Sequence, residues 1–264
     1  MSAAARATGD GVLVGLRSLL AKELHEQWRT LRLPILVVVF LIIGFGSPVL
    51  ARFTPELVRT LAGDQFTISL PPPTAADAVD QLLKNGTQFG ILVAILLAMG
   101  SVATERERGT AALLLVGPAS RTAFLVAKLA VLALTLALAV AGAVATAWLY
   151  TAILFTTPSP AGFAGAGILL WLELLVFTAL TFLGSTISRS VLAAAGLGFA
   201  LLIVLGVLSA IPTVGAVIPT GLAGTARTVA LGLPEPDWRP VAGAIVLVVA
   251  VVGASIAVFE REEL

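Results

Sequence analysis

Long uncharged apolar runs decide what this chain can fold into. Five runs without Asp, Glu, Lys or Arg cover residues 33–51, 85–104, 129–172, 190–226 and 240–259. About 20 apolar residues are enough to cross the hydrocarbon of a bilayer as a helix. Charged residues make up 12% of the chain, against ~25% in soluble domains, and the mean hydropathy is +1.05. The sequence therefore predicts an all-α polytopic membrane protein.

The two longest runs must be divided. The run 129–172 contains the turn signal Thr-Thr-Pro-Ser-Pro-Ala-Gly at 156–162, and the run 190–226 contains Pro212 and Pro219. Between the fifth and sixth spans we expect either short broken helices that dip into the outer leaflet or a hydrophobic outer loop. The sequence predicts one domain, 1–264, with six transmembrane helices at 33–51, 85–104, 124–155, 165–187, 191–210 and 241–259.

Helix signals also precede the first two spans. Residues 11–32 place apolar side chains at helical spacing opposite basic ones, which predicts an amphipathic interfacial helix that turns at Pro34 into the first span. Thr74, with Asp77 three residues later, forms a pattern like a capping box. We expect a helix to begin there, to run into the second span without a break, and to project beyond the membrane.

The distribution of Lys and Arg predicts the orientation. Six spans put both termini on one side, which carries 11 of the 16 Lys and Arg residues, whereas the other side carries 5. Cytosolic loops of membrane proteins are enriched in these residues. We therefore expect both termini to be cytoplasmic, and Lys128 to reach the cytosolic surface. Charges that continue to Arg32 argue against a cleaved signal peptide.

A short charged island separates the second and third spans. Its four consecutive ionised side chains, at 105–108, are costly in hydrocarbon and should lie in water. Gly109 can end a helix and Thr110 can start one, so residues 111–116 are predicted to form a short apolar helix that ends at Gly117 and Pro118. So short a helix needs support, either from lipid or from a protein groove. Both alternatives stay open from the residues alone.

The same sequence excludes several kinds of site. It has no cysteine, one histidine (His25) and no phosphate-binding loop motif. Thiolate or multi-histidine metal sites and a nucleotide site in this chain are therefore not expected, and neither is intramembrane hydrolysis.

Glu173 lies well inside a predicted span, which makes it a candidate intramembrane polar site. The alternative is an acid that lies near the interface or is bonded to a neighbouring Thr or Trp.

The island resembles a known family. Its acidic residues, Gly109-Thr110, the leucines at 113–115, the stretch 118–121 and Lys128 look like the cassette of type-2 permeases of ATP-binding-cassette (ABC) exporters. Lys22-Glu23 before the first span is similar to that family's N-terminal Lys-Glu. The resemblance extends over nearly the whole chain in the order of its elements.

The resemblance implies a role for the island. Residues 105–121 would be the cytosolic coupling loop that docks in a separate ABC ATPase, and the interfacial helix would be the elbow helix. The implied elbow residues are Lys22, Glu23 and Trp28. The implied coupling residues are Glu105, Arg106, Glu107, Arg108, Gly109, Thr110, Leu113, Leu114, Pro118, Ser120 and Arg121.

The resemblance also implies an assembly. Two permease chains, identical or different, would pair with two ATPase subunits in the plasma membrane of a bacterium. ATP and Mg²⁺ would be bound by the ATPases, and this chain would hold no cofactor, no metal and no nucleic acid. The substrate would be lipophilic or amphiphilic. The alternatives are a non-transporting scaffold for a signalling ATPase and an ion-coupled secondary transporter, for which Glu173 is the one candidate acid.

Overall fold

The computed structural model describes residues 3–62, 71–107, 109 and 121–261. All regular elements in these ranges are helices, and six are long and apolar enough to cross a membrane, which confirms the predicted fold class. The elements are α1 (Ala3–Arg29), α2 (Arg32–Ala62), α3 (Ala75–Ala98), α4 (Ala103–Glu107), α6 (Arg121–Leu154), α7 (Pro160–Ile187), α8 (Val191–Ser209), α9 (Pro212–Gly215), η1 (Pro219–Gly221), α10 (Leu222–Ala230) and α11 (Arg239–Arg261).

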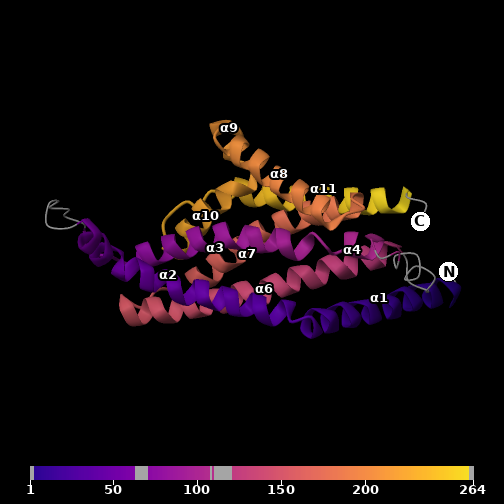
Figure 1. Cartoon of the computed structure of the whole chain (residues 1–264), viewed down its shortest axis with the longest axis horizontal. Coiled ribbons are helices and arrows are strands. Elements are labelled where there is room, and N and C mark those ends of the chain that lie inside the picture. Colours follow the sequence, from indigo (N-terminus) through magenta and orange to yellow (C-terminus); the bar gives the residue numbers. More distant parts are fainter. Residues whose placement is uncertain (1–2, 63–70, 108, 110–120, 262–264) are drawn as a thin grey trace.

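The long helices run side by side along the long axis of the molecule (Figure 1). The start of α1 and the end of α11 lie at the same end of this bundle, together with α4 and the start of α6. We call this the termini end, and the opposite end the far end. Helix α7 is the most deeply buried of the six spans, since 72% of the residues in its apolar stretch are buried inside the protein. The short helices α9, η1 and α10 precede α11, as predicted from Pro212 and Pro219.

Local signals explain where several helices start. The N–H of Thr74 donates to Asp77 Oδ2 at 2.7 Å, so the predicted helix start at Thr74 is confirmed. Ser159 accepts the N–H of Gly162 at 3.2 Å, and Pro160 follows at a position where no N–H is needed. At the far end, Arg227 of α10 donates to Asp80 of α3 at 2.5 Å, which ties the broken helices to the second span.

The entry into the first span differs from the prediction. The chain turns at Thr30 and Leu31, where Leu31 has φ 59°, and not at Pro34. Pro34 instead occupies the first turn of α2, which tolerates proline because its N–H has no helical partner. Helix α2 also continues to Ala62 rather than ending at 51, through Pro48 and Pro55.

The helix that begins after Thr74 runs into the second span without a break, as predicted, but the span itself is interrupted farther along. Helix α3 ends at Ala98, and α4 begins at Ala103 after a turn. The N–H groups of Val102 and Ala103 both donate to the Ser185 hydroxyl of α7, each at 3.0 Å. A break in a membrane helix is tolerated when a side chain satisfies the freed backbone groups. Ser185 performs this function here.

Small residues bring the helices close together. An added Cβ at Gly44 of α2 would collide with the backbone of Ala143 on α6, and one at Gly90 of α3 would lie 2.8 Å from Leu174 of α7. Helix α8 uses Gly198 in the same way, beside Thr181 of α7. Close backbone approach is a common way for membrane helices to associate. The fifth span, α8, therefore packs against the rest of the chain through small buried residues, namely Ala194, Ala195 and Gly198.

Candidate functional site

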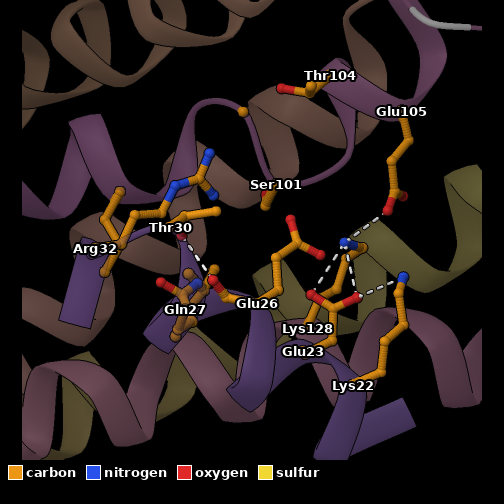
Figure 2. Close-up of a pocket in the computed structure, with 13 residues that line it drawn as sticks. Lys22, Glu23, Glu26, Gln27, Thr30, Arg32, Ser101, Thr104, Glu105 and Lys128 are labelled. Atoms are coloured by element: carbon orange, nitrogen blue, oxygen red, sulfur yellow. Dashed lines mark hydrogen bonds and ion pairs between the residues drawn. The ribbon is translucent and has the colours of Figure 1, made fainter.

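Lys128 of α6 joins three elements at the termini end. Its ammonium lies 3.1 Å from Glu23 Oε1 of α1 and 3.0 Å from Glu105 Oε1 of α4. Lys22 adds a second cation, 3.4 Å from Glu23. Figure 2 shows these four side chains converging from three helices, with Lys22 and Glu23 both on α1. We call Lys22, Glu23, Glu105 and Lys128 the ionic cluster.

The ionic cluster is largely shielded from solvent. The exposed fractions of the side chains are 6% for Lys128, 8% for Glu23 and 16% for Glu105. The ammonium also lies 5.0 Å from the centre of the Phe124 ring. Buried charges are tolerated only when they are paired, because removing them from water is costly. Lys128 therefore does not reach the cytosolic surface as expected from the sequence.

The next charged residues of the island also contact the chain itself. Arg106 lies over the Phe259 ring of α11, 5.6 Å from its centre. Glu107 Oε1 accepts the N–H of Val191 at 2.8 Å and so caps the start of α8, where a negative charge is favourable. The sequence predicted a fully wet island. The structure shows Glu105, Arg106 and Glu107 bound to α6, α11 and α8.

The two ends of the island are anchored as well. Gly109 has φ 66° and its N–H bonds to the Arg106 carbonyl at 3.1 Å, in keeping with its predicted role in ending a helix. Arg121 donates to the carbonyls of Phe259 and Glu260, each at 3.4 Å. The other predicted coupling residues lie outside the described residues: Arg108, Thr110, Leu113, Leu114, Pro118 and Ser120.

Helix α1 turns a polar face toward the bundle. Glu23 and Gln27 are buried, at 7% and 6% exposure, whereas Trp28 is 63% exposed and Leu31 58%. Trp28 and Leu31 therefore point away from the protein, which suits contact with lipid, whereas Leu19 of the same helix packs against the core. Of the predicted elbow residues, Lys22 and Glu23 join the ionic cluster, and Trp28 faces outward. The location of α1 at the membrane surface stays a prediction.

A polar cavity of about 470 Å³ opens beside the ionic cluster. Helix α1, the start of α2 and the turn after α3 form its walls (Figure 2). Its lining includes three cations and three carboxylates, namely Lys22, Arg32, Lys128, Glu23, Glu26 and Glu105. An apolar groove of about 470 Å³ adjoins it between α2 and α3.

Glu173 lies at the contact between α3 and α7. It is 2% exposed, and the Thr87 hydroxyl donates to its Oε2 at 2.8 Å. Nearby, Asn85 donates to Ser47 of α2 at 3.1 Å. The structure therefore has the bonded arrangement that was one of the two alternatives for this acid. No group of three or more His, Cys, Asp or Glu that could hold a metal occurs in the described parts of the chain.

Sequence reasoning did not identify Ser185, Gln27 or the internal role of Lys128. Ser185 is one of several hydroxyls in an apolar helix, and only the neighbouring helix break gives it a special role. Gln27 belongs to no sequence motif that would have predicted its burial in the contact between α1 and the bundle. Lys128 did carry a signal, since a lysine inside a long apolar segment needs a partner if it is buried.

Two comparisons with known proteins bear on the identity of the chain. A family described as ABC-2 family transporter protein matches residues 17–264, which is nearly the whole chain. The chain is also similar to an uncharacterized transmembrane protein, YxlG, of Bacillus subtilis (strain 168). The two are 30% identical over 190 residues, covering 70% of this chain and 73% of that protein. The chain therefore belongs to the ABC-2 family of transporter proteins, as a multi-pass membrane permease subunit.

Proposed function

We propose that this chain is the membrane subunit of an ATP-driven exporter, with hydrolysis carried out by a separate ABC ATPase. The substrate is a lipophilic or amphiphilic molecule. Two permease chains, identical or different, associate with two ATPases in the bacterial plasma membrane, with both termini in the cytosol. ATP and Mg²⁺ belong to the ATPases, and the present chain supplies the route through the membrane and the surface that receives the motion.

The observation that carries this proposal is the ionic cluster around Lys128. Glu105 begins the coupling loop, Lys128 follows it on α6, and Glu23 belongs to the elbow helix. One buried ammonium thus connects the three elements that a docked ATPase would move together. Displacing the loop without α1 and α6 would leave buried charges unpaired, which is costly. The ion pairs of the cluster hold these three elements together, so that they would move as a unit.

The intramolecular contacts refine which island residues meet the ATPase. Glu105, Arg106 and Glu107 contact α6, α11 and α8. These charges hold the base of the loop in place. We therefore assign the docking surface to Leu113 and Leu114, in the stretch for which the sequence predicts a short apolar helix that needs a protein groove or lipid for stability. The fixed base and the apolar turn together form a coupling device.

Lateral surfaces of the bundle suit pairing with a second permease chain. Helix α8 exposes Leu192 (82%), Ile203 (66%) and Val207 (65%), and α11 exposes Val246 (68%). In a bilayer these side chains meet either lipid or another helix. We assign the permease–permease contact to one of these apolar faces, beside the substrate route.

Co-purification tests the proposal. The tagged chain is purified from membranes of its native host, and an accompanying ABC ATPase is identified by mass spectrometry and by Mg²⁺-dependent ATP hydrolysis. The variant Leu113→Glu/Leu114→Glu should lose the ATPase. Leu233→Glu, an exposed leucine at the far end, is the matched control and should retain it. Retention by both variants, or absence of any ATPase, would contradict the proposal.

Transport distinguishes an exporter from a signalling scaffold. The purified complex is reconstituted in liposomes, and the movement of fluorescent lipid analogues is followed after ATP addition on the ATPase side. We expect ATP-dependent movement away from that side. ATP hydrolysis with no movement of any tested amphiphile would favour the scaffold.

A further inference from the structure

The polar cavity beside the ionic cluster continues into an apolar groove. The cavity and the groove share the walls formed by Thr30, Arg32, Leu97, Gly100 and Thr104. The groove is lined farther along by apolar side chains of α2 and α3, among them Leu36, Val39, Val93 and Leu96. A charged chamber next to an apolar groove has the polarity of an amphiphile, with a headgroup at one end and an acyl chain at the other.

Charge accounting within the cavity leaves one cation and one anion. Lys22, Glu23, Glu105 and Lys128 pair among themselves as two cations and two carboxylates. Arg32 and Glu26 also line the cavity, and no described residue forms an ion pair with either. Both side chains are exposed and are directed toward the same space next to Ser101 (Figure 2). They suit a ligand with one negative and one positive group.

Gln27 supplies an independent observation. It is 6% exposed, it lines the same cavity, and its Oε1 has no hydrogen-bond partner among the described residues. A buried acceptor without a partner is destabilising. Because the oxygen itself is closed off from solvent, a ligand in the cavity that donates a hydrogen bond would satisfy it once the amide group rotates. A primary ammonium group donates such bonds, whereas a quaternary ammonium group has no N–H.

We propose that this cavity and groove form a binding site for a phospholipid with an amine–phosphate headgroup, of the phosphatidylethanolamine type. The phosphate binds Arg32, the ammonium binds Glu26 and Gln27, and one acyl chain lies along Val39 and Val93. Trp28 flanks the site on the outside of α1, where aromatic side chains are typical of the headgroup level. The site would lie in the leaflet at the termini end and does not depend on an ATPase.

Native mass spectrometry of the purified full-length chain tests this proposal. The delipidated chain is titrated with phosphatidylethanolamine, phosphatidylcholine and phosphatidylglycerol that carry identical acyl chains. We expect phosphatidylethanolamine to bind about tenfold more tightly than either other lipid, because its ammonium reaches Gln27 and its phosphate reaches Arg32. Equal binding of the three lipids by the unaltered chain would overturn the proposal.

Matched variants locate the site. Arg32→Gln should weaken phosphatidylethanolamine binding about tenfold, whereas Arg29→Gln, an exposed arginine one turn earlier that does not line the cavity, should leave it unchanged. Gln27→Leu should remove the preference over phosphatidylcholine. Val39→Trp fills the groove and should weaken all three lipids. Equal effects of Arg32→Gln and Arg29→Gln would contradict the site.

The tail-free headgroup provides the last control. Phosphoethanolamine alone should fail to displace phosphatidylethanolamine, since it gains nothing from the groove. Displacement at comparable concentration would show a headgroup pocket without an acyl-chain groove and would overturn the lipid assignment. Thermal unfolding of each variant checks that it is folded. Because no ATPase is present, failure here leaves the proposed coupling function standing.

Discussion

The Lys128 ammonium and the Glu105 carboxylate lie 3.0 Å apart, although they stand on opposite sides of the loop 105–121. Their ion pair closes that loop at its base. Glu23 of α1 binds the same ammonium at 3.1 Å, so α1 is fastened to the same point. One buried lysine therefore links the base of the loop to both α1 and α6.

Removing the Lys128 charge should destabilise the fold. Lys128→Met keeps the length of the side chain but leaves two shielded carboxylates facing each other, which costs about 3–5 kcal/mol for a buried pair. Thermal unfolding in detergent, followed by circular dichroism, measures the loss. Lys84→Met, an exposed lysine of α3, should change little. Equal stability of the two variants would show that the cluster contributes nothing to the fold.

The ion pair also predicts rescue by charge exchange. Glu105→Lys alone places three cations together and should destabilise the chain. Combining it with Lys128→Glu restores opposite charges at these two positions, although Glu23 then faces a carboxylate. We expect the double variant to unfold at a higher temperature than Glu105→Lys alone. Additive destabilisation would show that the two side chains do not interact.

The Ser185 hydroxyl should contribute more to the stability of the fold than the neighbouring hydroxyls do. Ser185→Ala removes the acceptor for the N–H groups of Val102 and Ala103, at about 1–3 kcal/mol for each buried donor left without a partner. Thr186→Val is the matched control, because the Thr186 hydroxyl bonds only to the Phe182 carbonyl of its own helix. Denaturation midpoints compare the two. A smaller effect of Ser185→Ala would contradict its role at the helix break.

Two glycines of α2 provide a packing test. Gly44→Ala forces a methyl group into the backbone of Ala143, and overpacking costs about 1–3 kcal/mol. Gly46→Ala meets no atom within 4 Å and should stabilise the helix slightly, since alanine is the better helix former. The opposite order of the two unfolding temperatures would show that α2 and α6 do not approach closely at Gly44.

Features that depend on the local sequence were predicted well. The apolar runs predicted six spans, Thr74 and Asp77 predicted the start of α3, and Gly109 predicted a helix end. Pro212 and Pro219 predicted the broken helices before α11. Each of these signals acts through hydrophobicity or through backbone geometry within a few residues, which the sequence displays directly.

Features that depend on a distant partner were not predicted. The break after Ala98 needs the Ser185 hydroxyl from another helix, and Gly100 and Ser101 at the break are only a weak local signal for it. Lys128 was expected to reach water because its partners, Glu23 and Glu105, are far away in the sequence. For α1, the helical period could be predicted, but not which face meets protein, since apolar residues can equally face lipid.

A distance measurement on the permease–ATPase complex tests the central claim most directly. The chain has no cysteine, so Ala21→Cys on α1 and Leu192→Cys on α8, both exposed positions, can be spin-labelled selectively once the cysteines of the ATPase are replaced. ATP with vanadate should shift the distance between the two labels, and Lys128→Met should abolish the shift while the ATPase stays bound. An identical shift in the Lys128→Met complex would show that ATP-driven motion does not pass through this lysine.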